Sequence, residues 1–496
     1  MDTNASNANN TNNGDGASAG SGALRANAVG AAGIVFFVVA AASPLSAALG
    51  GSPAAIGAGN GAGAPGAYLA VGVVLLLFAV GYAAMSRYVT TGGGFAAYVH
   101  EALGARMGRG AAYLATVSYV AMQVGLYGIF GFFADVVFGQ QLGIDLPWPV
   151  WAFLAMVLVG VLAWFDIDLS AKVLGVLMIC EVVVLLVVDF AIVGKGGAHG
   201  LSLAGFSPDT VTGGALGIAL MFAFASFIGF EATAIYSEEA RDPSRTIPRA
   251  TYAAVLLITV FLVFTVWCFV VGHGVDTVRD EARHSPDAFV FTLSSRYVGA
   301  AWTDIMQYLL ITSFFAALLA FHNTIARYLL SLSRRGWGPR PLARTHPRHR
   351  SPHIAGAVQS VVGAVLVAIF VAAGLDPYTA VFSWSVGLGT LGVIVLQAWT
   401  CVAIITYFRR HRTGLGAWRT LIAPGLGGAG LVTAIVLALR NWDVLVGSDT
   451  GVSNYLPWIV PAVILIGVLL PAGAHRTSPS SAHSLDRQKA TWTQPH

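Results

Sequence analysis

Long apolar runs separated by short polar or Gly- and Pro-containing segments repeat along almost the whole chain. About 20 consecutive apolar residues are needed for a helix to cross a bilayer, so each run is predicted to span a membrane. About twelve spans are predicted, at residues 27–58, 66–87, 110–138, 148–165, 170–194, 214–237, 249–272, 303–332, 354–373, 377–407, 419–439 and 455–473. The chain is therefore predicted to be an all-α membrane protein.

The two ends of the chain differ from this pattern. Residues 1–22 are rich in Asn, Gly, Ser and Ala without an apolar period, and residues 475–496 are polar. Both are predicted to be disordered tails. Between them we expect a core of ten spans, residues 23–408, followed by two further helices in residues 409–474.

Composition agrees with a membrane protein. Of 496 residues, 56% are hydrophobic and only 10% are charged, with a mean hydropathy of +0.72; soluble domains carry about 25% charged residues. Cys180, Cys268 and Cys401 are isolated in apolar runs, which favours neither a disulfide framework nor a metal site. No cofactor or metal is predicted, and no ATP-binding motif supports ATP-driven transport. The basic net charge does not indicate that the protein binds nucleic acid.

The distribution of Lys and Arg predicts the orientation. Placing both termini on one side assigns 22 of the 27 Lys and Arg residues to that side. The other side has Lys195, Arg279, Arg283, Arg296 and Arg440. The positive-inside rule therefore predicts a multi-pass protein of a bacterial plasma membrane with both termini in the cytoplasm.

Two of the predicted spans are interrupted. The first span (27–58) contains Ser43-Pro44, and the sixth (214–237) contains Gly229 two residues before Glu231. They lie five spans apart, so they cross the bilayer in opposite directions, and such a pair is typical of a transporter site at the midplane. The alternative is that Pro44 only kinks its helix and Gly229 only permits close packing. Glu231 lies at the second break, and burying a carboxylate in a membrane is energetically unfavourable. Its presence there therefore favours the transporter site.

Several motifs together resemble the amino acid–polyamine–organocation (APC) permeases. They are Phe-Ile-Gly-Phe-Glu at 227–231, the charged segment 238–249, Gly-Gly-Gly-Phe-x-x-Tyr at 92–98, the 326–352 loop region and the charged 166–172 connection. This resemblance covers nearly the whole chain outside the tails. It implies a core of two inverted five-helix repeats with two additional helices, and transport of amino acids or amines.

The free N–H and C=O groups at the two breaks suit the two ends of an amino acid. We expect the substrate carboxylate near the backbone of Ser43, Leu45 and Ser46. The ammonium is expected near the carbonyls of Ala225, Ser226, Phe227 and Ile228 and those of the first span around Ala41, with Ala42, Gly229 and Phe230 completing the site. Pro44 departs from the Gly-Ser-Gly break common in the family and removes a donor, for which the Ser43 and Ser46 hydroxyls are expected to substitute. The segment after the sixth span is expected to leave the membrane, and Pro248 to begin the next helix.

Three polar side chains at membrane depth are candidates for proton coupling or gating: Glu231, Glu181 and His322. A carboxylate in a low-dielectric surrounding favours its protonated form, which suits proton exchange. The alternatives are a hydrogen bond across the helix break for Glu231, structural pairing for Glu181 and packing for His322.

These observations predict secondary active transport of neutral or apolar amino acids, by proton-coupled symport with alternating access. The coupling ion is expected to be a proton or a sodium ion. An amino acid or amine exchanger, a channel and a permease-derived sensor stay open as alternatives. An enzyme is not expected, because no nucleophile–base or metal constellation is found. The sequence makes no prediction of the oligomeric state.

Overall fold

The computed structural model describes most of the chain between the two predicted tails. The described residues are 43–89, 94–165, 171–231, 242–347, 349, 351–411, 413–447 and 451–470. Within these ranges the chain forms helices and no β-strand. Both predicted tails, Ala42 and the exit segment 232–241 lie outside the described residues.

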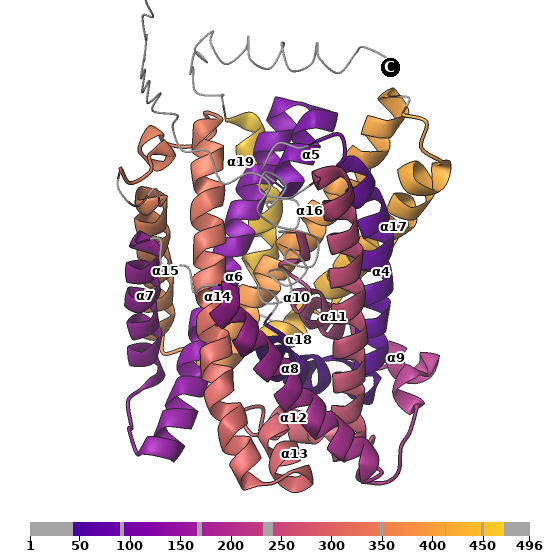
Figure 1. Cartoon of the computed structure of the whole chain (residues 1–496), viewed down its shortest axis with the longest axis vertical. Helices are drawn as coiled ribbons and strands as arrows, with labels where there is room; N and C mark the ends of the chain where they lie inside the picture. The colour runs from indigo at the N-terminus through magenta and orange to yellow at the C-terminus, as the bar shows by residue number, and fades with distance from the viewer. Residues whose placement is uncertain are drawn as a thin grey trace, which may run out of the picture.

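Eleven elements form the body of the molecule (Figure 1). They are α4 (Ala64–Met85), α6 (Ala105–Leu142), α7 (Trp148–Trp164), α8 (Ala171–Gly194), α10 (Leu216–Ala225), α11 (Pro243–His273), α14 (Ala300–Arg334), α15 (His353–Ala372), α16 (Ser383–Arg410), α17 (Ala423–Arg440) and α19 (Ile459–Leu469). The shorter elements are α2 (Pro44–Ser46), η1 (Ala47–Gly51), α3 (Ser52–Ala54), η2 (Ala55–Asn60), η3 (Gly61–Gly63), α5 (Gly94–Leu103), η4 (Ala204–Phe206), α9 (Pro208–Thr212), α12 (Val278–His284), α13 (Phe289–Tyr297), η6 (Arg340–Ala343), η7 (Pro377–Phe382), η8 (Trp418–Ile422), α18 (Trp442–Val446) and η9 (Val452–Trp458).

Eight helical runs in the described part of the chain are long and apolar enough to cross a membrane. Three shorter apolar helices accompany them, at Trp148–Trp164, Leu216–Ala225 and Ser453–Leu469. One of the eight runs, Pro44–Met85, leaves helical geometry at Gly59 (φ −88°, ψ −125°) and at Gly61 (φ +62°, ψ −128°), so two helices meet there. The multi-span architecture is clear, whereas the expected count of twelve is not established.

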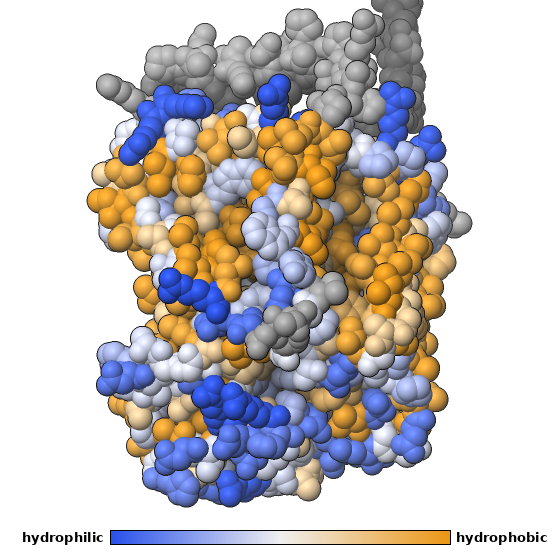
Figure 2. Space-filling model, turned by 180° about the vertical axis from the view of Figure 1, so that it is seen from behind, coloured by the Kyte–Doolittle hydropathy of each residue, from blue (hydrophilic) through white to orange (hydrophobic). Residues whose placement is uncertain are grey.

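Helix α6 lies at the centre of the bundle and packs against α5, α7, α14, α16 and α19. Helix α4 packs against α11 and α17 on another side. Helix α5 lies at the upper end of the view and α12 and α13 at the lower end (Figure 1). From behind, apolar side chains cover much of the face between these ends, and hydrophilic side chains gather at the lower end (Figure 2). An apolar band between two polar ends is what a bilayer requires of a spanning protein.

The structure differs from the sequence-based expectations in three connections. Helix α11 begins at Pro243, so Pro248 lies inside it and does not begin it. The charged segment after α11 was expected only as a connection, but it contains the helices α12 and α13. Helix α5 also occupies a segment where no helix was predicted. All three are polar or short elements, which a search for long apolar runs does not detect.

The C-terminal helices pack onto the predicted core: α17 lies against α4 and α16, and α19 lies against α6. The division into a core at 23–408 and two accessory helices at 409–474 stays a prediction.

Candidate functional site

The first break begins at Ser43, whose backbone is left-handed (φ +43°, ψ 78°) directly before α2. Pro44 is the first residue of that helix. Because the first N–H of a helix has no intrahelical partner, a proline there sacrifices no helical hydrogen bond. The Ser43 hydroxyl donates to the Ser313 carbonyl of α14 at 3.3 Å, which ties the break to α14.

Glu181 of α8 reaches this break. Its Oε2 lies 3.5 Å from the backbone nitrogen of Leu45, and the side chain is only 4% exposed. The Ser313 side chain lies beside the carboxylate and shares a 2.8 Å hydrogen bond with the Ser46 hydroxyl. A carboxylate at a helix N-terminus is favoured by the free N–H groups and the helix dipole. Glu181 and two serines thus gather where the helix begins.

The second break follows α10, which ends at Ala225. At Gly229 the backbone turns to φ +118°, a conformation that a side chain strongly disfavours. The N–H of Gly229 donates to Oε2 of Glu231 at 2.9 Å. Tyr119 of α6 donates its hydroxyl to Oε1 at 2.8 Å, and Tyr82 of α4 donates to the Glu231 carbonyl at 3.0 Å. Glu231 therefore accepts the hydrogen bond of the N–H group at the break and connects the break to α6 and α4.

The two breaks enclose a cavity of about 70 Å³ at the centre of the bundle. Five of the predicted substrate-binding residues line it: Ser43, Ser46, Ala225, Ser226 and Ile228. The remaining lining residues, which sequence reasoning did not assign to the site, are Ala47, Gly51, Met122, Leu126, Phe222, Phe314, Ala317, Phe321, Phe382 and Val386. They come from the first broken helix, α6, α10, α14, η7 and α16, so the structure brings distant parts of the chain together.

Among the described residues that line the cavity, serines supply the polar side chains and none is Asp, Glu, Lys or Arg. Ser226 donates its hydroxyl to the Phe222 carbonyl at 3.0 Å and lies 3.3 Å from the Tyr68 hydroxyl. Most of the wall is aliphatic or aromatic. Such a cavity suits a small ligand with an apolar side chain and a few polar groups.

Other predicted site residues pack around the cavity without lining it. Leu45, Phe227 and Phe230 are buried, and Phe230 stacks edge-on against Phe78 of α4 with ring centroids 6.1 Å apart. Gly229 forms the turn of the second break. Ala42 lies outside the described residues, so its predicted contact with substrate stays a prediction.

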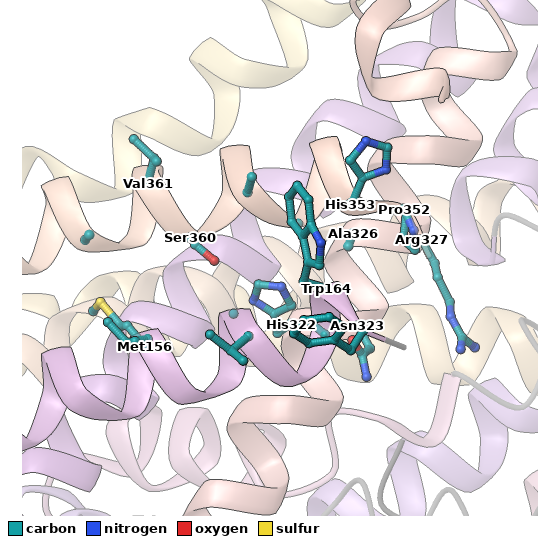
Figure 3. A pocket seen from close by; sticks show the side chains of 18 of the residues that line it. Met156, Trp164, His322, Asn323, Ala326, Arg327, Pro352, His353, Ser360 and Val361 are labelled. Carbon is teal, nitrogen blue, oxygen red and sulfur yellow. The ribbon is translucent and has the colours of Figure 1, made fainter. Parts of the chain in front are cut away.

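His322 is separated from the central cavity. Its neighbour Phe321 lines the cavity, whereas His322 lines a different, lateral one between α7, α14 and α15 (Figure 3). Its predicted part in proton coupling would therefore have to act through α14. Within the described ranges, no three His, Cys, Asp or Glu side chains gather in a way that could hold a metal ion.

At the end of the bundle that contains α12, two arginines of that helix form hydrogen bonds with the first broken helix. Arg283 donates from Nε to the Gly57 carbonyl at 2.7 Å, and Arg279 donates from Nη2 to the Gly59 carbonyl at 3.3 Å. Carbonyls at a helix C-terminus lack intrahelical partners and attract cations. Helix α12 thus closes over that end of the first broken helix.

Comparison with known families identifies the chain. The amino acid permease family model matches residues 33–476, which is most of the sequence. The chain belongs to the amino acid permease family. It is therefore a multi-pass membrane transporter of the APC superfamily and not an enzyme.

Individual relatives in this family are distant. The chain is 30% identical over 257 residues to an uncharacterized transporter of Mycobacterium tuberculosis, a match of 51% of this chain and 54% of the relative. It is 24% identical to the branched-chain amino acid permease BcaP of Bacillus subtilis, over 51% of this chain and 50% of that one. It is 27% identical to the L-asparagine permease of Salmonella typhimurium, over 84% of this chain and 85% of that one. The matches to the first two cover about half the length of each relative.

A solved structure has the same fold. The crystal structure of a manganese transporter mutant from Eremococcus coleocola aligns with a TM-score of 0.55 and 13% sequence identity, covering 88% of this chain and 93% of that one. At this identity the likeness concerns the fold alone. It confirms the predicted fold class, an all-helical transporter with broken helices.

Proposed function

We propose that this amino acid permease carries neutral, mainly apolar amino acids across the plasma membrane by proton-coupled symport. The observation that carries the proposal is the wall of the central cavity, which combines serines at two helix breaks with apolar side chains. An amino acid has two charged ends and a variable side chain. Helix ends and hydroxyls suit the charged ends, and the apolar wall suits the side chain.

The charge of the wall supports neutral substrates. A cationic side chain in a low-dielectric site needs a partner of opposite charge, and no carboxylate among the described residues lines the cavity. Branched-chain and asparagine permeases are among the relatives, which agrees with neutral substrates. A lysine-specific permease of Lactococcus lactis is also a relative, 29% identical over 54% of this chain. Transport of lysine is therefore the matched negative control.

Glu181 and Glu231 are proposed to couple the protons. Each carboxylate is buried and bonds to the backbone beside one break. Protonation removes its charge and weakens its attraction for the N–H group it accepts from. A proton can thereby change how firmly each break is held, which links protonation to helix movement.

The orientation proposed places the α5 end in the cytoplasm, as the Lys and Arg distribution predicts. The end with α12 then faces outward, and the Arg279 and Arg283 contacts act as an external latch. Alternating access requires this latch to open when the site faces outward.

Uptake into proteoliposomes tests the proposal. Labelled leucine should accumulate saturably when the interior is alkaline, lose this accumulation with a protonophore, and keep it when sodium is replaced by potassium. Labelled lysine should accumulate far less under the same gradient. Accumulation driven only by a sodium gradient would contradict proton coupling, and preferential lysine uptake would contradict the neutral-substrate assignment.

The same vesicles separate the other mechanisms. An exchanger should need amino acid preloaded inside and respond little to the pH gradient. A channel should give conductance that does not saturate, and a sensor should bind leucine without net uptake. Each of these results would replace symport by the corresponding mechanism.

A further inference from the structure

A second cavity of about 590 Å³ opens between α7, α14 and α15, apart from the central one. Glycine and alanine residues on the three helices leave room for the cavity, and larger side chains line the rest of it. Its lining residues are Phe153, Met156, Val157, Gly160, Val161, Ala163, Trp164, Phe165, His322, Asn323, Ala326, Arg327, Pro352, His353, Gly356, Ala357, Ser360, Val361 and Ala364. Val157 and Val361 are more than half exposed on the outer surface of the bundle, so the cavity opens toward the bilayer.

Several polar atoms in this cavity lack partners in the described part of the protein. His322 is 0% exposed; Gln359 of α15 lies beside its ring, but no hydrogen bond of standard geometry reaches either ring nitrogen. The hydroxyl of Ser360 and Nδ1 of His353 are buried without a partner as well. Unsatisfied polar groups are costly in hydrocarbon. Their gathering in one cavity points to an occupant with polar atoms.

The cavity is amphiphilic along its length. Met156, Ser360 and Val361 lie on one side of His322, and Trp164, His353 and Arg327 lie on the other (Figure 3). Tryptophan is enriched where a protein meets the headgroup region. One half therefore suits an acyl chain and the other a charged headgroup.

The headgroup half of the cavity is lined by one arginine, Arg327, and by no Asp or Glu of the described residues. No Asp or Glu occurs between Asp304 and Asp376, a stretch that includes most of α14, all of α15 and their connection. The same stretch has Arg327, Arg334, Arg335, Arg340, Arg344, Arg348 and Arg350, of which the last two lie outside the described residues. Asp166 and Asp168 follow α7 and also lie outside them. Arg327 is the one Lys, Arg, Asp or Glu among the described residues that line the cavity, so this end of it favours an anion.

We propose that an anionic phospholipid binds in this lateral cavity. One acyl chain lies beside His322 and Met156, the ester oxygens meet the imidazole and the Ser360 hydroxyl, and the phosphate lies by Arg327 and His353. Phe321, next to His322, lines the central cavity. A lipid seated here therefore contacts the same helix as the transported substrate, on another face.

Lipid retained by the purified full-length protein tests the proposal directly. After washing in detergent, mass spectrometry should find phosphatidylglycerol or cardiolipin bound in excess of their share in the source membrane. Added phosphatidylglycerol should raise the unfolding temperature more than phosphatidylcholine with the same acyl chains. Equal effects of the two lipids, or retention of a fatty acid without a phospholipid, would overturn it.

Matched variants locate the bound lipid. Ala357→Phe fills the cavity and should reduce retained phospholipid severalfold, whereas Val358→Phe, on the next residue and outside the lining, should not. Arg327→Gln should reduce the preference for phosphatidylglycerol over phosphatidylcholine about fivefold, as expected for loss of one cation near a lipid headgroup. Arg340→Gln, outside the lining, is its control. Wild-type retention in Ala357→Phe, or wild-type preference in Arg327→Gln, would contradict the site; if Ala357→Phe does not fold, the Arg327 pair still decides.

Discussion

Glu181 accepts a hydrogen bond from the backbone where the first broken helix begins. The charge of its carboxylate therefore affects the strength of that bond. We expect Glu181→Gln to flatten the pH dependence of leucine uptake. Wild-type uptake should fall as the external pH rises, because fewer carboxylates are protonated, whereas an amide keeps the uncharged state at every pH. Uptake measured across a pH series checks this.

The exposed Glu101→Gln on α5 is the control for that experiment and should retain the wild-type profile. If Glu181→Gln protein has the same pH profile as the wild type, Glu181 has only a structural role and does not couple protons.

Glu231 accepts hydrogen bonds on both carboxylate oxygens, from Gly229 and from Tyr119. In Glu231→Gln, an NH₂ group must face one of these donors, and one bond is lost. The variant should still insert but be less stable by about 1–3 kcal/mol, and it should lose proton-driven accumulation or shift its pH dependence. Thermal unfolding and uptake measure the two effects separately.

Tyr119→Phe separates the two roles of Glu231, because it removes one donor and leaves the carboxylate. If Tyr119→Phe is destabilised and still shows wild-type pH dependence, while Glu231→Gln does not, the carboxylate itself couples protons. Wild-type uptake and pH dependence in Glu231→Gln would make its role structural.

At the scale of elements, α12 holds the Gly57–Gly59 end of the first broken helix through Arg283 and Arg279. Arg283→Gln should shift the protein toward the state in which the central cavity opens at this end. Loss of one hydrogen bond to a charged group costs about 1.5–3 kcal/mol, enough to change populations about tenfold or more.

Labelling of Ser226→Cys with a membrane-impermeant thiol reagent measures this opening. The exposed Cys180 should first be replaced by serine, while Cys268 and Cys401 are buried. Labelling should be faster in the Arg283→Gln background than in an Arg296→Gln control on α13, since Arg296 is not part of the latch. Equal rates would show that α12 does not limit access.

Elements were predictable from the sequence where apolar length alone defines them. The run predicted at 354–373 is α15 at His353–Ala372, because about 20 apolar residues have few alternatives in a bilayer. Helix α12 was not predictable in this way, since five of its seven residues are charged or His and its stability comes from contacts with a distant segment.

The candidate site shows the same division. Ser43, Ser46 and Glu231 were recognisable because a polar residue contrasts with an apolar helix. Met122, Phe382 and Val386 were not, because an apolar residue among apolar neighbours gives no local signal. Only packing between helices that are distant in sequence shows which of them face the cavity.

For the molecule as a whole, Arg109 connects the last helix to the centre of the bundle. Its Nε donates to the Gly467 carbonyl at 2.7 Å and its Nη2 to the Val468 carbonyl at 3.3 Å. These carbonyls end α19 and lack intrahelical partners. Arg109→Met keeps an apolar stem but removes both bonds, and we expect it to be less stable by about 1.5–3 kcal/mol.

Thermal unfolding in detergent measures that loss, with the exposed Arg106→Met on the same helix as control. If the last two helices are accessory to the transport core, Arg109→Met protein that remains folded should keep the wild-type affinity for leucine. A changed affinity would show that α19 belongs functionally to the core.

The turn at Gly229 also bears on how such a protein can move. Its backbone conformation disfavours any residue with a side chain, and the N–H it frees is already occupied by Glu231. The interruption therefore need not be created or repaired in each transport cycle. Movement about this turn would therefore not require a helical hydrogen bond at Gly229 to break, because none is present there.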